Sequence, residues 1–494
     1  MFYLTEITVI KRRILTLLCE YLLNGEYEKI RDIPYIISGY KNKPYRCCIY
    51  HDRAISADRI KTLLGLDEKK YGNISWSDCI KEAISSKNEM PYIYVMSEAC
   101  HECPQKRYYI TEACQHCVAH PCKMNCPKNA IEIRANRAVI NEDLCVECSL
   151  CSKLCPYHAI IEVSRPCENS CPVNAIKTNK EGVAEIDESK CILCGRCLLS
   201  CPFGAIVEKS SVKDFILDLK QGVKFNAILA PSIIGQFSPK SSLEQIITCL
   251  NACGFQEIAE AASGADEAGD IESSEALEME KHGLKFLTSS CCPSFVDCIK
   301  KHFPNLTENI SATLSPMILT ARTLKRKHPD SKIVFIGPCI SKKKEAAEYK
   351  DNLVDYVLTF EEIACVFAAK KIDVSSLERA SIPEPATRQG RGFGAAGGVT
   401  QAIKHYLSKK NKDFKFDSKL INGLNKETLK ILKAAAFGKT DFNFIEGMCC
   451  EDGCIGGPGI ITKPQLSKKM LEELLNKSSD TEPLSKLLKR NGSV

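Results

Sequence analysis

The stretch LTSSCCPSF, from Leu287 to Phe295, sets the interpretation of the whole sequence. A short apolar run, typical of a buried strand, leads into two adjacent cysteines, Cys291 and Cys292, and a proline follows them. Adjacent cysteines do not easily bind one metal together in a relaxed backbone geometry. We therefore expect one of the pair to be a ligand and the other to do different chemistry.

The residues around this stretch alternate between strand and helix patterns. Beyond about residue 211, the strand candidates are VKFNAILAP, LKFLTS, SKIVFIGP and VDYVLTF, with helical patterns between them, which indicates an α/β domain. FIGPCISKKKE, with Cys339 and Lys342, also follows a strand candidate, and EGMCCEDGCIGG holds Cys449, Cys450 and Cys454. Ligand sites of α/β sheets collect at the carboxyl ends of strands, so these motifs are candidates for one site.

Upstream, residues 96–210 contain an internal repeat. CPKNAIEI, CPYHAIIEV, CPVNAIKTN and CPFGAIVEK begin at Cys126, Cys155, Cys171 and Cys201, and four such copies do not arise by chance. The second and fourth copies complete the spacing C-x2-C-x2-C-x3-C-P of bacterial ferredoxins, in which the fourth cysteine ligates the other cluster of a pair. Structural zinc more often uses two separated C-x2-C pairs and is the weaker alternative.

Counted together, these repeats and one upstream C-x2-C pair supply enough thiolates for four 4Fe–4S clusters. The candidate ligands are Cys100, Cys103, Cys114, Cys117, Cys122, Cys126, Cys145, Cys148, Cys151, Cys155, Cys167, Cys171, Cys191, Cys194, Cys197 and Cys201. We expect copies two and four to share two clusters and the remaining cysteines to share two more. The alternative is three clusters, with Cys100 and Cys103 free. A chain of such clusters moves single electrons between a surface partner and a redox site.

Composition limits the class of protein. The 494 residues are enough for about three domains of ~150 residues. The 30 cysteines, many in C-x2-C runs, indicate metal binding rather than disulfides. No apolar run approaches the ~20 residues that span a bilayer, and the N-terminus lacks a secretory signal, so we expect a cytoplasmic protein without a membrane partner. The net charge of +6 comes from scattered basic residues, so nucleic-acid binding is not supported.

The three motifs beyond residue 210 resemble, in order and separation, the active-site signatures of the iron-only, or [FeFe], hydrogenases. The family pattern is T-S-C-C-P-x-[W/F], then P-C-x-x-K-x-x-E, then M-x-C-x-x-x-C-x-x-G, and GRGFGAAGGVTQA at 390–402 is similar to the family's Gly-rich segment. The resemblance covers about residues 96–460 and looks most like the group B branch. It implies a multidomain α+β fold, in which a ferredoxin-like iron–sulfur domain precedes a two-lobed α/β iron hydrogenase catalytic domain.

The expected domains are an N-terminal, mostly helical region of unassigned role (1–95), the ferredoxin-like domain (96–210), the catalytic domain (211–464) and a C-terminal helical tail (465–494). Nine cysteines have no role in this scheme, and buried structural thiols are the default for them. They are Cys19, Cys47, Cys48, Cys79, Cys249, Cys253, Cys298, Cys365 and Cys449.

The resemblance also implies a cofactor, the H-cluster. Cys292, Cys339, Cys450 and Cys454 match the ligands of its 4Fe–4S part, and Cys454 matches the bridge to a two-iron subcluster that carries CO, cyanide and an azadithiolate. Cys291 matches the acid/base that passes protons to the bridgehead amine, which a thiol of suitably shifted pKa can do.

Further residues match the family's proton relay and the second layer around the cofactor. Glu272, Glu275 and Ser311 match the relay, although solvated helix carboxylates are the plain alternative for either glutamate. Lys342 matches a donor to cyanide, Met448 a residue that packs near the two irons, and Pro231 and Ser232 a pair that contacts cyanide.

The sequence departs from the family in the same second layer. Gly337 stands where many relatives carry methionine, Phe295 replaces a common tryptophan, and EDGCIGGPG replaces a glycine-richer stretch. These departures affect the expected catalytic bias and rate, since such neighbours tune potential and proton affinity, but not the ligands.

The resemblance implies reversible reduction of protons to H2, with electrons from ferredoxin or flavodoxin and with diiron maturation proteins as further partners. Two alternatives remain. One is a non-catalytic relative that assembles iron–sulfur clusters, which we expect to lack the relay cysteine and glutamates. The other is an H2 sensor, for which no signalling module is visible in the sequence.

Overall fold

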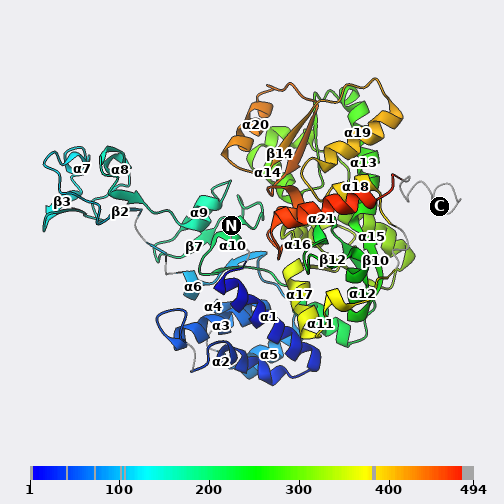
Figure 1. Ribbon diagram of the computed structural model, residues 1–494, viewed down its shortest axis with the longest axis horizontal. Coiled ribbons are helices and arrows are strands. Elements are labelled where there is room, and N and C mark those ends of the chain that lie inside the picture. The colour runs from blue at the N-terminus through cyan, green and yellow to red at the C-terminus, as the bar shows by residue number, and fades with distance from the viewer. Residues whose placement is uncertain are drawn as a thin grey trace.

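The computed structural model describes residues 4–40, 43–71, 74–100, 103–104, 107–380 and 385–480. Figure 1 shows an elongated molecule, with a small iron–sulfur module projecting at one end of the long axis and the helical and α/β parts at the other. Within the described ranges, no helix is long and apolar enough to cross a membrane. Residues 481–494 of the expected C-terminal tail lie outside the described residues, and α21 (Pro464–Lys477) is the helix of the part that is described.

The N-terminal region is helical, as its composition suggests. Its longest helix, α1, starts after Thr5, whose side chain accepts the Thr8 N–H, and ends at Gly25 with a φ of 75°. Buried apolar residues on α1 join the core that surrounds the larger sheet, because α1 packs against α11 and α17. The region comprises α1 (Glu6–Asn24), α2 (Ile33–Ile37), α3 (Ile49–Leu63), α4 (Glu68–Tyr71) and α5 (Trp76–Ser85).

The repeat region folds into two small modules, each closed by an antiparallel pair of short strands from its two ends. In the projecting module β2 pairs with β5, and in the other β1 pairs with β8. The projecting module contains β2 (Tyr108–Ile110), α7 (Pro121–Met124), β3 (Ile131–Arg134), β4 (Arg137–Ile140), α8 (Leu150–Leu154) and β5 (Ile160–Glu162). The second contains β1 (Ile93–Val95), α6 (Ser97–Cys100), α9 (Pro166–Ser170), β6 (Ile176–Thr178), β7 (Ala184–Ile186), α10 (Arg196–Ser200) and β8 (Ile206–Glu208).

The α/β region has two parallel sheets, one in each lobe. The larger has the strand order β10-β9-β12-β13, and the smaller has the order β11-β15-β14. The strands are β9 (Phe225–Leu229), β10 (Phe255–Glu260), β11 (Leu287–Thr288), β12 (Lys332–Ile336), β13 (Tyr356–Leu358), β14 (Ser418–Asn422) and β15 (Phe444–Met448).

Helices cover both sheets. They are α11 (Val212–Lys220), α12 (Leu243–Cys253), α13 (Ala261–Glu278), α14 (Pro293–His302), α15 (Pro316–Lys327), α16 (Ser341–Glu348), α17 (Phe360–Ala369), α18 (Arg388–Gly392), α19 (Gly398–Lys410) and α20 (Lys426–Ala436). The four strand candidates from the sequence are confirmed as β9, β11, β12 and β13. Strands β10, β14 and β15 were not predicted, although β15 leads directly into the third cysteine motif.

Candidate functional site

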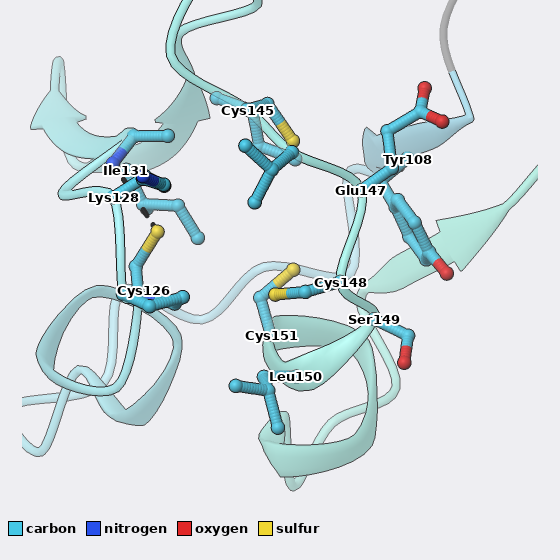
Figure 2. Close-up of a pocket in the computed structure, with 14 residues that line it drawn as sticks. Tyr108, Cys126, Lys128, Ile131, Cys145, Glu147, Cys148, Ser149, Leu150 and Cys151 are labelled. Carbon is cyan, nitrogen blue, oxygen red and sulfur yellow. Dashed lines mark hydrogen bonds between the residues drawn. The ribbon is translucent and has the colours of Figure 1, made fainter.

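In the projecting module, the eight cysteines of repeats one and two form two groups of four. Figure 2 shows the first group, in which Cys126 of repeat one faces the three leading cysteines of repeat two across a shared hollow. The second hollow is lined by Cys155 of repeat two and the three leading cysteines of repeat one. The members are Cys126, Cys145, Cys148 and Cys151 in one group, and Cys114, Cys117, Cys122 and Cys155 in the other.

The second module groups the remaining cysteines in the same crossed manner. Burial raises the pKa of the Cys167 thiol to about 11, and its charged neighbours include Cys201 and Cys100. Burial also raises the pKa of Cys103, with Cys201 and Cys100 again nearby. The two groups are Cys100, Cys103, Cys167 and Cys201, and Cys171, Cys191, Cys194 and Cys197.

The expected sharing between repeats is therefore wrong. Repeat two pairs with repeat one, and repeat four pairs with repeat three and the upstream C-x2-C. The reason is the strand pairing, since β2 with β5 encloses the first two repeats and β1 with β8 encloses the last two. The C-x2-C pair, Cys100 and Cys103, lies beside Cys167 and Cys201, which favours four thiol groups over three.

The four cysteines that we expect to bind the H-cluster lie just beyond strand ends. Cys292 follows β11, Cys339 follows β12, and Cys450 and Cys454 follow β15. Burial raises the pKa of Cys292 to about 11 and that of Cys454 to about 12, and in both cases the next contribution comes from the charge of Cys339. Burial raises the pKa of Cys450 as well, with the other three as charged neighbours.

Four neighbouring, partly buried thiols fit a multi-iron cluster, because thiolates held this close together need a cationic centre. In the part of the chain that is described, no three or more His, Cys, Asp or Glu side chains are grouped to hold a metal ion. That statement concerns sites for a single metal ion and not sites for a cluster of several iron atoms. The soft thiolate set is the one that iron–sulfur clusters use.

Cys291 lies at the inner end of a row of acidic and hydroxyl groups. Glu272, on α13, is 1% exposed, and its Oε1 accepts the Ser290 N–H at 3.3 Å. Ser311 Oγ donates to Glu275 Oε2 at 2.6 Å, and Thr313 Oγ1 donates to Glu275 Oε1 at 3.1 Å. The prediction that the two glutamates share a helix is confirmed, and the structure brings them together with Ser311.

Electrostatics distinguish the two glutamates. Burial raises the pKa of Glu272 to about 8, so this side chain is protonated at neutral pH, and its Oε2 has no hydrogen-bond partner among the described residues. Glu275 is only partly buried. Burial, followed by the charge of Glu272, raises the pKa of Cys291 well above its usual value. The expectation of a Cys291 pKa shifted toward neutrality is therefore wrong, since burial and the neighbouring acidic groups outweigh the ammonium of Lys342, which binds the Cys291 carbonyl.

Lys342 reaches back across the site from α16. Its Nζ donates to the Cys291 carbonyl at 3.3 Å and to Glu345 Oε2 at 2.6 Å. Burial alone would lower the pKa of Lys342, but the charges of Glu345, Cys339 and Cys291 raise it, so the side chain remains an ammonium. This places a fixed positive charge beside the thiols.

Two of the other expected contacts of the cofactor, Met448 and Ser232, are buried. Met448 is 3% exposed at the end of β15 and packs in one apolar cluster with Cys291 and Cys292. Pro231 and Ser232 follow β9, and the buried Ser232 Oγ has no hydrogen-bond partner among the described residues. A buried hydroxyl without a partner suits contact with a polar ligand that the site is built to hold.

The second module contacts the candidate site through repeat four. Gly195 has a φ of 72°, and a Cβ there would lie 2.6 Å from Pro458 and 2.7 Å from Ile340. Arg196 Nη2 donates to the Cys449 carbonyl at 3.4 Å. Cys449 is 1% exposed and packs in one cluster with Cys194 and Cys292, one ligand candidate from each side.

Sequence reasoning missed the position of Cys449 at this junction. It was treated as a structural thiol, although its place beside Cys450 in the motif MCC was a signal. The default of a buried thiol is also wrong for Cys47, which is exposed, and for Cys48, which is partly exposed. The other cysteines without a role are buried, as expected.

Comparison with known protein families agrees with this geometry. Residues 223–458 match the family model of the iron-only hydrogenase large subunit, C-terminal domain. Residues 138–161 match a 4Fe–4S binding domain, and residues 161–212 match the LdpA Fe–S cluster-binding domain. The expected order of a ferredoxin-like iron–sulfur region followed by an iron hydrogenase domain, in a mixed helix and strand fold, is confirmed.

Individual relatives are distant. Iron hydrogenase 1 of Clostridium pasteurianum is 30% identical over 273 residues, which cover 47% of this chain and 47% of that protein. The cytosolic Fe–S cluster assembly factor narfl of Danio rerio is 24% identical over 251 residues, covering 40% of this chain and 60% of that protein. A solved [FeFe]-hydrogenase variant from Chlamydomonas reinhardtii has a TM-score of 0.44 and 20% identity, covering 54% of this chain and 89% of that one. The chain spans about half the length of the curated hydrogenases it matches.

Proposed function

The chain is an iron-only-hydrogenase-like protein, and on that premise we propose that it catalyses the reversible reaction 2H⁺ + 2e⁻ ⇌ H₂. The observation that carries the proposal is the row of groups from Glu275 through Ser311 and Glu272 to Cys291. An iron–sulfur protein that only stores or transfers electrons has no use for a buried proton path to one thiol.

Cys292, Cys339, Cys450 and Cys454 would hold the 4Fe–4S part of an H-cluster, and Cys454 would bridge to its two-iron subcluster with CO, cyanide and azadithiolate. When bound, this group supplies the redox chemistry that forms and splits H2. The protein would supply a buried ammonium at Lys342, an unpaired hydroxyl at Ser232 and apolar packing at Met448. An ammonium suits an anionic ligand such as cyanide.

The proton route follows from burial and protonation state. Glu275, which is partly exposed, would take protons from solvent and pass them through Ser311, whose hydroxyl is both donor and acceptor. Glu272 holds its proton at neutral pH, and its free Oε2 is available for the next hydrogen bond in the row. Cys291 would rest as a neutral thiol, give its proton inward and regain one from Glu272, since a persistent thiolate is disfavoured at this site.

Electrons would reach the site through four accessory 4Fe–4S clusters. The group that contains Cys194 adjoins Cys449 and Cys292, so it would be the last of the path. The projecting module would receive electrons from ferredoxin or flavodoxin. Many of its apolar side chains are exposed, which favours a transient docking surface there: Val118, Met124, Leu144, Val146, Leu150, Leu154 and Tyr157.

The test is hydrogen evolution from dithionite-reduced methyl viologen, under strict anaerobiosis, with protein loaded with the complete cofactor by diiron maturation proteins. The wild type should be active, and Cys291→Ala should lose almost all activity with its iron content unchanged. Cys249→Ala is a matched control, because Cys249 is a buried cysteine in α12, outside the proposed site.

A second candidate is a non-catalytic role in iron–sulfur assembly, which the similarity to narfl favours. A fully loaded wild type that evolves no hydrogen would support that role, or a role as an H2 sensor, over catalysis. Transfer of iron–sulfur clusters to an apo acceptor protein would then separate assembly from sensing.

A further inference from the structure

The fourth repeat carries a different type of residue from the other three at one turn position. The residue three places after the last cysteine of each repeat has a positive φ, which is 50° at Asn129, 50° at His158, 51° at Asn174 and 61° at Gly204. Asparagine and histidine occupy the first three positions, so glycine is not required by the turn itself. Another cause must account for Gly204.

That cause is the N-terminal helix α1. A Cβ at position 204 would lie 2.5 Å from Ile7 Cγ1 and 2.9 Å from Lys11 Cε. The space that a side chain occupies in the other repeats is thus taken here by two residues of α1. Gly204 marks repeat four as the place where the N-terminal region docks.

The docked region brings an arginine to the same peptide group. Arg59, on α3, is 3% exposed, and its Nη2 donates to the Gly204 carbonyl at 2.6 Å. The N–H of this peptide, on Ala205, donates to Cys201 Sγ at 3.3 Å. Because a hydrogen bond at one end of a peptide polarises it, the arginine strengthens the N–H donor that faces the ligand sulfur.

This arrangement is specific to one cluster site. The equivalent amides of Ala130, Ala159 and Ala175 also donate to their cysteine sulfurs, at 3.3, 3.4 and 3.2 Å. Among the described residues, however, no side chain donates to the carbonyls that precede them. In the described part of the chain, the Cys201 loop alone has a cation hydrogen-bonded to the carbonyl of this peptide.

The neighbouring charges leave a positive excess at this loop. Arg46 also donates to the loop, at Phe203 O, but it forms an ion pair with Asp52 at 3.3 Å. Within the described residues, neither Arg59 nor Lys11 forms a salt bridge. The nearby acids have other partners, since Glu361 pairs with Arg12 at 2.6 Å, and Glu208, at 3.2 Å, shares Lys343 with Glu362.

A third cation comes from the module itself. Arg165 is 7% exposed, donates to the Gly182 carbonyl at 2.7 Å, and acts electrostatically on Cys100 and Cys103 of the same thiol group. The partly exposed Glu168 acts in the opposite sense. The positive groups around this site therefore come from both the N-terminal region and the iron–sulfur module.

We propose that the N-terminal helical region is an electrostatic cap, which uses Arg59 and Lys11 to raise the reduction potential of the cluster bound by Cys100, Cys103, Cys167 and Cys201. Reduction adds one negative charge to a thiolate-bound cluster, so nearby cations and stronger N–H···S bonds stabilise the reduced state. The inference rests on the proposed accessory clusters, and it gives a role to a region that has no ligand cysteines below residue 100.

The test is an anaerobic potentiometric titration of the full-length, cluster-loaded chain, followed by electron paramagnetic resonance. Cys201→Ser identifies the signal of this cluster by its loss or change. Arg59→Gln removes the charge but keeps a donor, and it should lower the one-electron reduction equilibrium constant of that cluster about tenfold, equivalent to about 59 mV. Arg59→Lys should shift it less, and Arg137→Gln, on a partly exposed arginine of the projecting module, should leave it unchanged.

A second variant tests the cap without changing a charged residue. Gly204→Asn introduces the residue that repeats one and three carry, but it collides with α1. It should lower the same midpoint and expose the N-terminal helices to protease. The reverse change, Asn129→Gly in repeat one, is the control and should do neither.

The outcomes separate this inference from the proposed clusters. If Cys201→Ser leaves the iron content and all signals unchanged, the cluster assignment fails, and the cap proposal fails with it. If Cys201→Ser removes the signal while Arg59→Gln and Gly204→Asn leave its midpoint in place, only the cap proposal is overturned. If Arg59→Gln loses iron, Arg59→Lys and Gly204→Asn become the test. An unchanged midpoint in these two variants also overturns the cap proposal.

Discussion

Glu272 is a fully buried carboxyl group that we propose to be part of the proton route. It is 1% exposed on α13, and among the described residues one of its carboxylate oxygens has no hydrogen-bond partner. We expect Glu272→Gln to lower the rate of hydrogen evolution at least about 100-fold, because a relay group of this kind contributes ~10²–10⁴-fold. Glu278→Gln, on an exposed residue of the same helix, should have no effect at equal iron content. An active Glu272→Gln enzyme would remove Glu272 from the proton route.

The raised pKa of Glu272 also predicts a dependence of stability on pH. Burial raises it to about 8 in the folded chain, above the ordinary value of 4.5. The folded state therefore holds this proton more tightly than the unfolded state, and its contribution to stability is lost as the pH rises from about 5 to 8. The thermal midpoint should fall less over this range in Glu272→Gln than in the wild type, at equal cluster loading. Parallel curves for the two proteins would contradict the assignment.

At the scale of elements, the joint between β15 and α14 positions the third cysteine motif. A Cβ on Gly447 would lie 2.1 Å from the ring of Phe295, which is fully buried. Gly447→Ala should therefore destabilise the chain by about 1–3 kcal/mol through overpacking. The double variant Gly447→Ala/Phe295→Leu should regain part of that loss in urea unfolding. Equal stability of the wild type and Gly447→Ala would show that Gly447 and the Phe295 ring are not tightly packed.

Close packing against glycine accompanies two departures from the family pattern. Phe295 fills the space over Gly447 in place of the common tryptophan. At Gly337, a Cβ would lie 2.5 Å from the Phe335 ring and 3.1 Å from Ala230 Cβ, so a larger side chain such as methionine would require Phe335 to move. The second layer of the site is thus packed in its own way in this chain.

At the scale of the whole molecule, the projecting module leaves and rejoins the chain at one point. Val163 N–H donates to the Arg107 carbonyl at 2.6 Å, so a short linker can replace residues 108–162. The shortened chain should bind about eight fewer iron atoms, because two 4Fe–4S sites are removed. It should retain hydrogen evolution from reduced methyl viologen and lose most of its activity with reduced ferredoxin. Full ferredoxin-driven activity would place the docking surface elsewhere.

Several features could be predicted from the sequence because they depend on local spacing. The ferredoxin repeats, the strands that precede Cys291 and Cys339, and the helix that carries Glu272 and Glu275 are all local patterns. Strands β10, β14 and β15 could not be predicted, because the segments FQEIAE, SKLIN and FIEGM lack a clear period of two or a continuous apolar run.

By itself, the sequence determined the chemistry of this protein: which cysteines stand in ferredoxin spacing, and which motifs follow strands. Only the tertiary structure decided how the repeats share their cysteines, because short strands from distant segments, β2 with β5 and β1 with β8, enclose each pair. It also decided the high pKa of Cys291 and the position of Arg59 at the Cys201 loop. Burial and contacts between residues far apart in the chain cause these features, and no local pattern encodes them.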